Sequence, residues 1–233
     1  MPRPAAAVNR LLRGLPDRDR RRILAGCETV DLAFADVLCT PGDRIGHVYF
    51  PTRSFISLIM PIDDSASLEV GMVGNEGMFG IPLVLGVDVS PVGAVVLGGG
   101  AALRMDAAGF SREFGRSPAL HHAIDCYVFV HLSQLAQTAA CTRFHVVEAR
   151  LARWLLMTQD RVGPEFAMTQ EYLAQMLGTG RPSLSLTASQ MQRVGAIQYT
   201  RGLMRVLDRA ELEKLSCECY SVVRTMMADL ELG

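Results

Sequence analysis

The hydrophobic pattern of this 233-residue chain changes near Met105, and that change most constrains how the chain can fold. Between Leu24 and Leu103 the chain consists of short apolar runs of β-forming residues, separated by turns rich in Gly, Pro and Asp. Short strands with turn signals between them predict an antiparallel sandwich or barrel. After Met105, apolar residues recur at intervals of three and four, which is the spacing of amphipathic helices. The sequence therefore predicts an α+β protein with a β-rich N-terminal part and a mainly helical C-terminal part.

The first predicted long helix is uninterrupted, because no Gly or Pro appears between Pro118 and about Cys141. Ser117 is a suitable N-cap, and Pro118 suits the first helical position. Roughly 24 helical residues span about 36 Å. An apolar stripe with intervals of 4, 4, 3 and 4 follows the helix and consists of Ile124, Val128, Leu132, Leu135 and Ala139. Because this spacing is close to that of a coiled coil, we expect the helix to pair with a second copy in a homodimer. The alternative is an ordinary core helix.

Two short helices and a hairpin are predicted after a further helix at His145–Val162. The short helices cover Thr169–Leu177 and Pro182–Val194, are joined by a tight Gly-containing turn, and have Thr169 as the N-cap of the first. Ile197–Leu207 then predicts two alternating strands around Thr200–Gly202. A helix-turn-helix followed by a hairpin is a winged helix, so this region is predicted to bind DNA.

The charge distribution agrees with a DNA-binding region in the C-terminal half. The chain has 23 basic and 24 acidic residues and a formal net charge of −1. Between Thr142 and Arg209, however, nine Arg face five acidic residues, a local net charge of +4, and Ala210–Gly233 carries −3. Phosphate binding requires such a local excess of basic residues, although a solvated charged face has the same composition.

Several other classes of protein are excluded or disfavoured. No window reaches the roughly 20 apolar residues of a membrane span, and the N-terminus lacks the features of a secretion signal, so we expect a cytoplasmic protein. Motifs of metalloproteases, serine hydrolases and P-loop enzymes are absent, and Asp63-Asp64 is interpreted as a solvated pair in a turn, so no enzyme is expected. The six cysteines include no Cys-x-x-Cys pair. We therefore expect reduced, mostly buried thiols, with no metal and no cofactor.

The order of β-rich domain, long helix and winged helix resembles the Crp/Fnr superfamily of bacterial transcription regulators. The segments that carry the resemblance are Val48-Tyr-Phe-Pro-Thr, Val70-Gly-Met-Val-Gly-Asn-Glu-Gly-Met-Phe-Gly, Gln137-Thr-Ala-Ala-Cys, Leu151-Ala-Arg-Trp-Leu-Leu-Met, Leu173-Ala-Gln-Met-Leu-Gly and Arg181-Pro-Ser. The resemblance implies a β-roll effector domain similar to cyclic-nucleotide-binding domains at 1–116, a dimerisation helix at 117–141 and a winged helix-turn-helix at 142–233. It further implies a homodimer that reads a palindromic double-stranded DNA operator, regulates transcription and contacts RNA polymerase.

The resemblance also assigns roles to residues of the winged helix. Arg181 and Ser183 occupy positions that contact bases, and Arg181 has the geometry to bind guanine O6 and N7. The chain departs from the pattern at Gly180 and at Leu186, where related proteins have a basic or β-branched residue and a second Arg, respectively. The full set of expected DNA-binding residues is Thr169, Gly180, Arg181, Ser183, Gln190, Arg193, Arg201 and Arg205, of which the last two are expected to contact phosphates from the wing.

The cyclic-nucleotide cassette of the superfamily is degenerate in this chain. Gly80 and Ala94 match the pattern, but Ile81 stands where the ribose-binding Glu is expected, and Pro91 or Val92 replaces the phosphate-binding Arg. No Lys or Arg lies between Arg53 and Arg104, so a phosphodiester would be buried without a cationic partner, which costs several kcal/mol. We therefore expect a regulator that does not respond to cyclic nucleotides. The alternative is a dimeric ligand- or redox-sensing module with weakened DNA binding.

Overall fold

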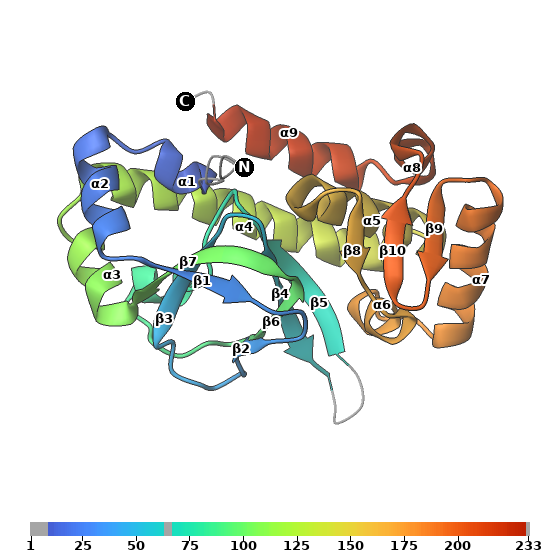
Figure 1. Ribbon diagram of the computed structural model, residues 1–233, viewed down its shortest axis with the longest axis horizontal. Coiled ribbons are helices and arrows are strands. Elements are labelled where there is room, and N and C mark those ends of the chain that lie inside the picture. The colour runs from blue at the N-terminus through green and yellow to red at the C-terminus, as the bar shows by residue number, and fades with distance from the viewer. Residues whose placement is uncertain (1–8, 63–66, 232–233) are drawn as a thin grey trace, which may run out of the picture.

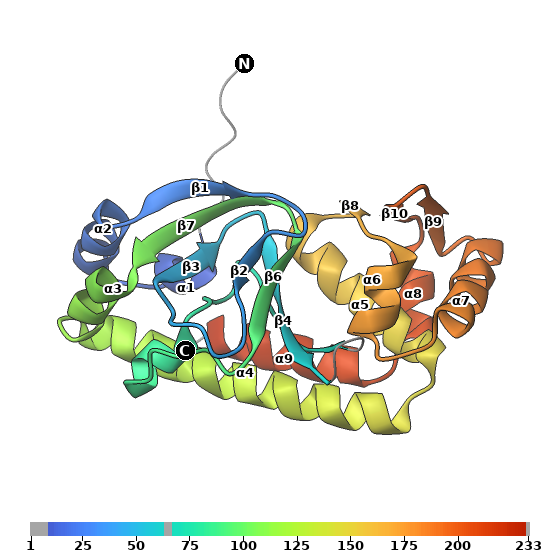
Figure 2. The same ribbon diagram turned by 90° about the horizontal axis from the view of Figure 1, so that it is seen from below.

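The computed structural model describes residues 9–62 and 67–231, and it has a β-rich domain at one end and a winged helix at the other (Figure 1). A long helix, α4, runs along one side of the molecule and connects the two ends (Figure 2). Asp63 and Asp64, the predicted solvated pair, lie outside the described residues, as do residues 1–8 of the predicted effector domain. Within the described part of the chain, the helices are all too short or too polar to span a bilayer.

The N-terminal domain consists of two antiparallel sheets with strand orders β1-β7-β3 and β2-β6-β4-β5, which confirms the predicted fold class. Phe50 and Ile56 are fully buried in its core, and Phe55 of β4 is fully buried against Trp154 of α5. The two faces in contact are apolar because the strands of this region alternate buried β-branched and aromatic residues. The elements are α1 Arg10–Arg13, α2 Asp17–Ala25, β1 Glu28–Leu32, β2 Val37–Cys39, β3 His47–Pro51, β4 Phe55–Pro61, β5 Ser67–Val73, the 3-10 helix η1 Ile81–Leu85, β6 Gly93–Gly98 and β7 Gly100–Asp106.

Two helices follow the sheets, α3 Ala107–Phe114 and α4 Pro118–Phe144. The Ser117 hydroxyl accepts a hydrogen bond from the amide of Leu120 at 3.1 Å, which confirms the predicted N-cap. The 27 residues of α4 extend three positions beyond the predicted end at Cys141. The helix ends because His145 adopts an extended backbone conformation, with φ −105° and ψ 145°.

The predicted apolar stripe of α4 does not lie on one free face of the helix. Ile124 is fully buried against the N-terminal domain, and Val128 and Leu135 are half-buried. Only Leu132 and Ala139 of the five predicted residues are exposed. The stripe is divided between two environments because intervals of three and four are equally compatible with packing on the protein's own sheet and on a second helix. Pairing of α4 with a second copy stays a prediction.

The C-terminal half forms the predicted winged helix with one additional strand. The wing is a three-stranded sheet of order β8-β10-β9, because β8 pairs with β10 on the side opposite β9. His145 and Val146 separate α4 from α5, so α5 begins two residues later than predicted. The elements are α5 Val147–Val162, β8 Glu165–Ala167, α6 Gln170–Met176, α7 Arg181–Arg193, β9 Ile197–Thr200, β10 Leu203–Val206, α8 Arg209–Leu215 and α9 Cys219–Glu231.

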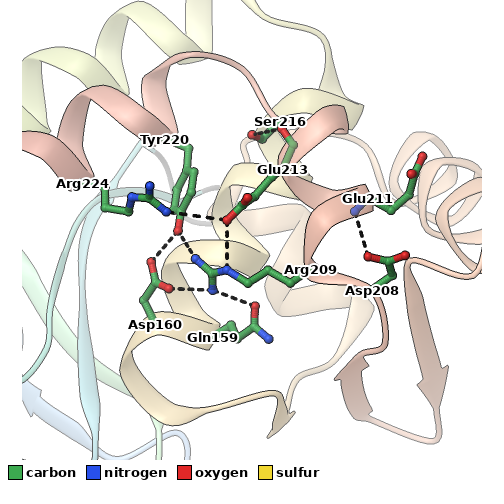
Figure 3. A network of polar contacts seen from close by, with 9 residues as sticks. All are labelled: Gln159, Asp160, Asp208, Arg209, Glu211, Glu213, Ser216, Tyr220 and Arg224. Carbon is green, nitrogen blue, oxygen red and sulfur yellow. Dashed lines mark hydrogen bonds and ion pairs between the residues drawn. The ribbon is translucent and has the colours of Figure 1, made fainter.

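The acidic C-terminal segment folds into α8 and α9, and α9 runs back alongside α4 toward the N-terminal domain (Figures 1 and 2). A polar network attaches α9 to α5 and α8 (Figure 3). Arg209 donates hydrogen bonds to Asp160 at 2.8 Å and to Glu213 at 3.0 Å, and the Tyr220 hydroxyl donates to Asp160 at 2.8 Å. Part of the negative charge of the C-terminal segment is therefore neutralised by ion pairs within the protein.

Candidate DNA-binding surface and effector cavity

The helix-turn-helix is held together by local hydrogen bonds and a small apolar core. The Thr169 hydroxyl accepts from the amide of Tyr172 at 3.2 Å, which confirms Thr169 as the N-cap of α6. Ser185 of α7 donates to Gln170 of α6 at 2.7 Å. Gly178 follows α6 with φ +55°, a left-handed conformation that glycine adopts at low cost. The inner face of α7 is buried and consists of Leu184, Thr187, Ala188 and Met191.

The outer face of α7 is exposed and carries most of the predicted base-contacting residues. Arg181 is the first residue of the helix, Gly180 is its N-cap, and Ser183 and Gln190 are exposed further along. Leu186 is 60% exposed near the centre of this face. A large apolar side chain at such a position is suited to contact the methyl group of thymine.

The wing ends in a two-residue turn at Arg201 and Gly202, with φ +47° and +82°. Positive φ at both central residues is characteristic of the type I′ turn that suits a two-residue hairpin. Arg201 therefore lies at the tip of the hairpin, where its side chain is exposed.

Most arginines of the basic region bind other parts of the protein. Arg205 is paired with Glu165 across the wing, and Arg209 with Asp160 and Glu213. Arg150 donates to the carbonyl of Leu177, and Arg153 and Arg161 are buried. Within residues 9–62 and 67–231, the guanidinium groups that make no hydrogen bond or ion pair include those of Arg181, Arg193 and Arg201. The local charge of +4 therefore does not form one continuous free patch. Among the described residues of this region, the free charge lies at both ends of α7, at the wing tip and at Arg143 near the end of α4.

A cavity of about 640 Å³ lies between the N-terminal sheets and α4. It includes the cassette positions Ile81, Pro91 and Val92, together with Leu132 and Leu135 of α4. Its other lining residues are Leu58, Met60, Leu68, Val70, Val73, Met78, Phe79, Gly80, Pro82, Ser90, His131, Thr138, Ala139 and Thr142. No described residue of the lining is an acid, a lysine or an arginine.

His131 is the titratable group of this lining, and its side chain is buried. Burial lowers the pKa of His131 to about 4, so the imidazole is neutral at pH 7. Its Nδ1 makes no hydrogen bond within the described part of the chain. The cavity is therefore electrically neutral and almost entirely apolar near physiological pH.

Two buried polar contacts join the wall of the N-terminal domain to α5. Glu76, in the turn after β5, accepts a hydrogen bond from Nε of Arg161 at 3.1 Å, and both side chains are nearly inaccessible to solvent. Glu69 of β5 accepts from Nε1 of Trp154 at 3.0 Å. A Cβ on Gly77 would overlap the Tyr127 ring of α4, so the Gly74–Gly77 turn needs its glycine for packing. The turn therefore connects the N-terminal domain to α4 and α5.

Sequence reasoning missed one group of potential ligands. Cys141, His145, Cys217 and Cys219 lie together where α4 meets the start of α9, although they are up to 78 positions apart in the chain. The spacing Cys217-Glu-Cys219 was the available signal, but the sequence does not indicate that α9 returns to α4.

Comparison with known proteins agrees with this architecture. Residues 149–215 match the Crp-like helix-turn-helix domain. No curated protein matches the chain at a significant level. Similar solved structures include a putative Crp/Fnr-family transcriptional regulator from Eubacterium rectale, with 15% identity, 88% of this chain and 96% of that chain covered, and a TM-score of 0.67.

Two further structures have the same fold. The c-di-GMP responsive global regulator CLP from Xanthomonas campestris has 18% identity, covers 83% of this chain and 100% of its own, and has a TM-score of 0.66. FixK2 from Bradyrhizobium japonicum has 12% identity, covers 82% of this chain and 98% of its own, and has the same TM-score of 0.66. The chain therefore has a Crp-like helix-turn-helix DNA-binding domain within the fold of the Crp/Fnr transcription regulators.

Proposed function

We propose that the chain regulates transcription as a homodimer that binds a palindromic operator, with α7 in the major groove and the wing on the adjacent backbone. The observation that carries this proposal is the position of the free guanidinium groups, at Arg181, Arg193 and Arg201. Most other arginines of the domain already have internal partners. Free basic side chains displace counterions from DNA, and an exposed α-helix fits the major groove.

The proposal divides the contacts by their position on the domain. Arg181 and Ser183, at the start of α7, read base edges, with guanine as the partner of Arg181. Leu186 contacts a thymine methyl group, which distinguishes this operator from one read by a second Arg. Gln190 and Arg193 contact the backbone from the far end of α7, and Arg201 contacts it from the wing tip. Thr169, Gly180 and Arg205 border this surface. Arg205 has a weaker contact because Glu165 already neutralises its charge.

Dimerisation is proposed to use the face of α4 that neither the N-terminal domain nor α9 covers. Phe129 and Leu132 are 62% and 59% exposed on this face, and Phe144 is exposed at its end. Ala136 and Ala140 lie between them at intervals of four residues and are exposed. Small residues between large apolar ones allow two helices to approach closely, and a second copy supplies the matching face. The two-fold operator then follows from the two-fold symmetry of the dimer.

The effector is proposed to be uncharged and mostly apolar. The cavity of about 640 Å³ is within the size range of small-molecule sites, and its lining offers no cation for a phosphate. The proposed division comprises an effector domain at 1–116, a dimerisation helix at 117–141 and a DNA-binding domain at 142–233, and the cavity lies where the first of these parts meets α4. With α4 continuing to Phe144, the helix crosses the last of these boundaries. Contact with RNA polymerase stays a prediction.

Selection of bound sequences from random DNA with the purified protein tests the proposal. We expect an enriched palindrome with half-sites centred about 10 base pairs apart. Arg181→Ala should weaken operator binding by about 1–3 kcal/mol and relax specificity at one position in each half-site. Arg116→Ala, an exposed arginine at the end of α3, is the matched control and should change neither. If no palindrome is enriched, or Arg181→Ala binds as wild type does, a sensing module with weakened DNA binding is the better description.

A further inference from the structure

Three cysteines and one histidine form a compact cluster at the junction of the two domains. Cys141 is in the last turn of α4, His145 follows the helix, and Cys217 and Cys219 lie at the start of α9. Their ligand atoms all lie within 4.8 Å of one another. The Sγ atoms of Cys141 and Cys217 are 3.5 Å apart, and Sγ of Cys219 is 3.4 Å from Nδ1 of His145.

We propose that this cluster is a structural zinc site with Cys141, His145, Cys217 and Cys219 as its four ligands. Thiolate and imidazole are the donors that Zn²⁺ prefers, and four protein ligands close the tetrahedral coordination of a structural site. Zn–S bonds of about 2.3 Å place two tetrahedral thiolates about 3.8 Å apart, close to the separation of Cys141 and Cys217. The ligand atoms are too close together to enclose a cluster of several metal ions.

The surroundings of the cluster provide the outer contacts that such a site needs. Nε2 of His145, the ring nitrogen that points away from the thiols, lies 3.3 Å from a carboxylate oxygen of Glu218. A metal-bound histidine characteristically donates its second N–H to a carboxylate, which fixes the tautomer and the ring orientation. The Gln137 amide donates to Sγ of Cys219 at 2.9 Å. The three cysteines are buried, so solvent has little access to the ligands.

The charge around the cluster gives a second, independent argument. Arg153 is buried and donates one hydrogen bond, to Thr138 at 3.1 Å, while its Nε has no partner within the described residues. Arg153 and Arg150 line the same small cavity as Cys141, together with one carboxyl group, that of Glu69, so two cations face one acid there. A buried guanidinium without an ion-pair contact is costly. Zinc with three thiolates and one neutral imidazole has a net charge of −1, which compensates a neighbouring cation.

The zinc ion would attach the start of α9 to the segment that connects α4 to α5. That segment, His145 and Val146, is where the DNA-binding domain joins the dimerisation helix. The polar network of Arg209 and Tyr220 holds the next turn of α9 to α5 and α8 (Figure 3). The metal would therefore help to set the orientation of the DNA-binding domain relative to α4. This role does not require that the proposed operator contacts are correct.

The metal content of the full-length protein tests the site directly. We expect about one zinc per chain after purification in reducing buffer without added metal, measured by mass spectrometry of the elements. Replacing zinc by Co²⁺ should produce the visible absorption of a tetrahedral, thiolate-bound cobalt ion. Both measurements use wild-type protein, so they do not depend on whether a variant folds.

A second pair of one histidine and one cysteine with the same spacing supplies matched controls. His122 and Cys126 lie four residues apart on α4, as Cys141 and His145 do along the chain, but no further ligand of the cluster type joins them within the described residues. Cys219→Ser and His145→Ala should lose the zinc and the cobalt absorption, whereas Cys126→Ser and His122→Ala should retain both. Metal-free wild-type protein with six titratable thiols would overturn the proposal. So would a Cys141–Cys217 disulfide in the reduced preparation, or iron with acid-labile sulfide in place of zinc.

Discussion

The effector cavity and the outer face of α7 belong to one chain but differ in charge. The lining of the cavity is neutral. It contains Ile81 where the Crp/Fnr resemblance predicts a Glu, and Pro91 or Val92 where it predicts an Arg. On the outer face of α7, Arg181 matches the resemblance and its guanidinium is free. The two regions therefore differ in chemistry: the cavity offers no cation for a phosphate, whereas the outer face of α7 carries free guanidinium groups that are proposed to contact DNA. Both are connected through β5 and α5, where Glu76 pairs with Arg161 and Glu69 with Trp154.

The largest expected effect comes from separating the two subunits, because both regions depend on the position of α4. Phe129→Glu combined with Ala136→Glu should bury unpaired charges in the proposed interface and weaken operator binding more than about 100-fold. Light scattering should report a monomer. These positions are preferable to Leu132 and Leu135, which also line the cavity.

Val37→Glu is the control for that variant, since Val37 is an apolar residue that is 61% exposed on the edge strand β2. It should remain dimeric with unchanged DNA binding. A wild-type protein that is monomeric at micromolar concentration would contradict the dimer interface altogether.

A smaller effect, on the free energy of unfolding, is expected at the contact between β5 and α5, which connects the two regions. Burial raises the pKa of Glu69 from 4.5 to about 7, although hydrogen bonds from Ser57 and Trp154 oppose the shift. Because the folded state binds this proton more tightly than the unfolded state, the stabilising contribution is fully present below about pH 4.5. It is lost as the pH rises through 7. The shift corresponds to about 3 kcal/mol of unfolding free energy.

Glu69→Gln should remove this part of the pH dependence, as measured by urea unfolding between pH 4.5 and 8. Glu171→Gln, an exposed position on α6, should leave the slope of stability against pH as it is in wild type. Equal slopes for wild type and Glu69→Gln would show that this carboxyl does not titrate as its burial implies.

The two arginines of the wing sharpen the comparison within the DNA-reading surface. Arg201→Ala should weaken binding to all DNA sequences by about 1 kcal/mol and reduce the slope of log affinity against log salt by about 1. Arg205→Ala should have a smaller effect, because Glu165 already neutralises that charge. Conversely, Glu165→Gln should strengthen nonspecific binding. If Arg201→Ala and Arg205→Ala reduce the slope of log affinity against log salt equally, the Arg205–Glu165 ion pair must break when the protein binds DNA.

The smallest expected effect is the absence of a response to cyclic AMP or cyclic GMP. A phosphodiester in the neutral cavity loses a charge-assisted pair, which removes roughly 2–5 kcal/mol and moves a micromolar affinity toward millimolar. Calorimetry with about 1 mM of each nucleotide should therefore detect no saturable binding. Saturable heat with a low-micromolar constant would show that Ile81 and Pro91–Val92 do not abolish the site.

Local signals in the sequence predicted most of the fold. Three features depend on residues only a few positions apart: the strands separated by turns, the N-caps Ser117 and Thr169, and the wing hairpin. The local sequence therefore specifies them. The same is true of the start of α7, which lies within one residue of its prediction. The interpretation of the cassette as degenerate also rests on local signals, because Ile81 and Pro91 stand where the resemblance predicts charged residues, and it stays a prediction.

Contacts between distant segments were not predictable in this way. Ile124 and Leu132 have the same spacing in the stripe, yet one is buried by the protein's own sheet and the other is exposed. The partner of Arg205 is 40 positions away, and the four residues of the cysteine cluster meet only because α9 returns along α4. Helical spacing and composition do not specify such pairings, since they are decided by how whole elements pack.

The turn at the tip of the wing has a consequence for how this protein can change. A left-handed backbone at Arg201 costs about 1 kcal/mol relative to glycine, and asparagine tolerates it better than arginine. Stability and DNA contact therefore favour different residues at one position. Selection for heat resistance alone would be expected to replace Arg201 by Asn or Gly, and selection for operator occupancy would restore the guanidinium. An arginine at this position is therefore a compromise between an unstrained hairpin turn and a positive charge at its tip.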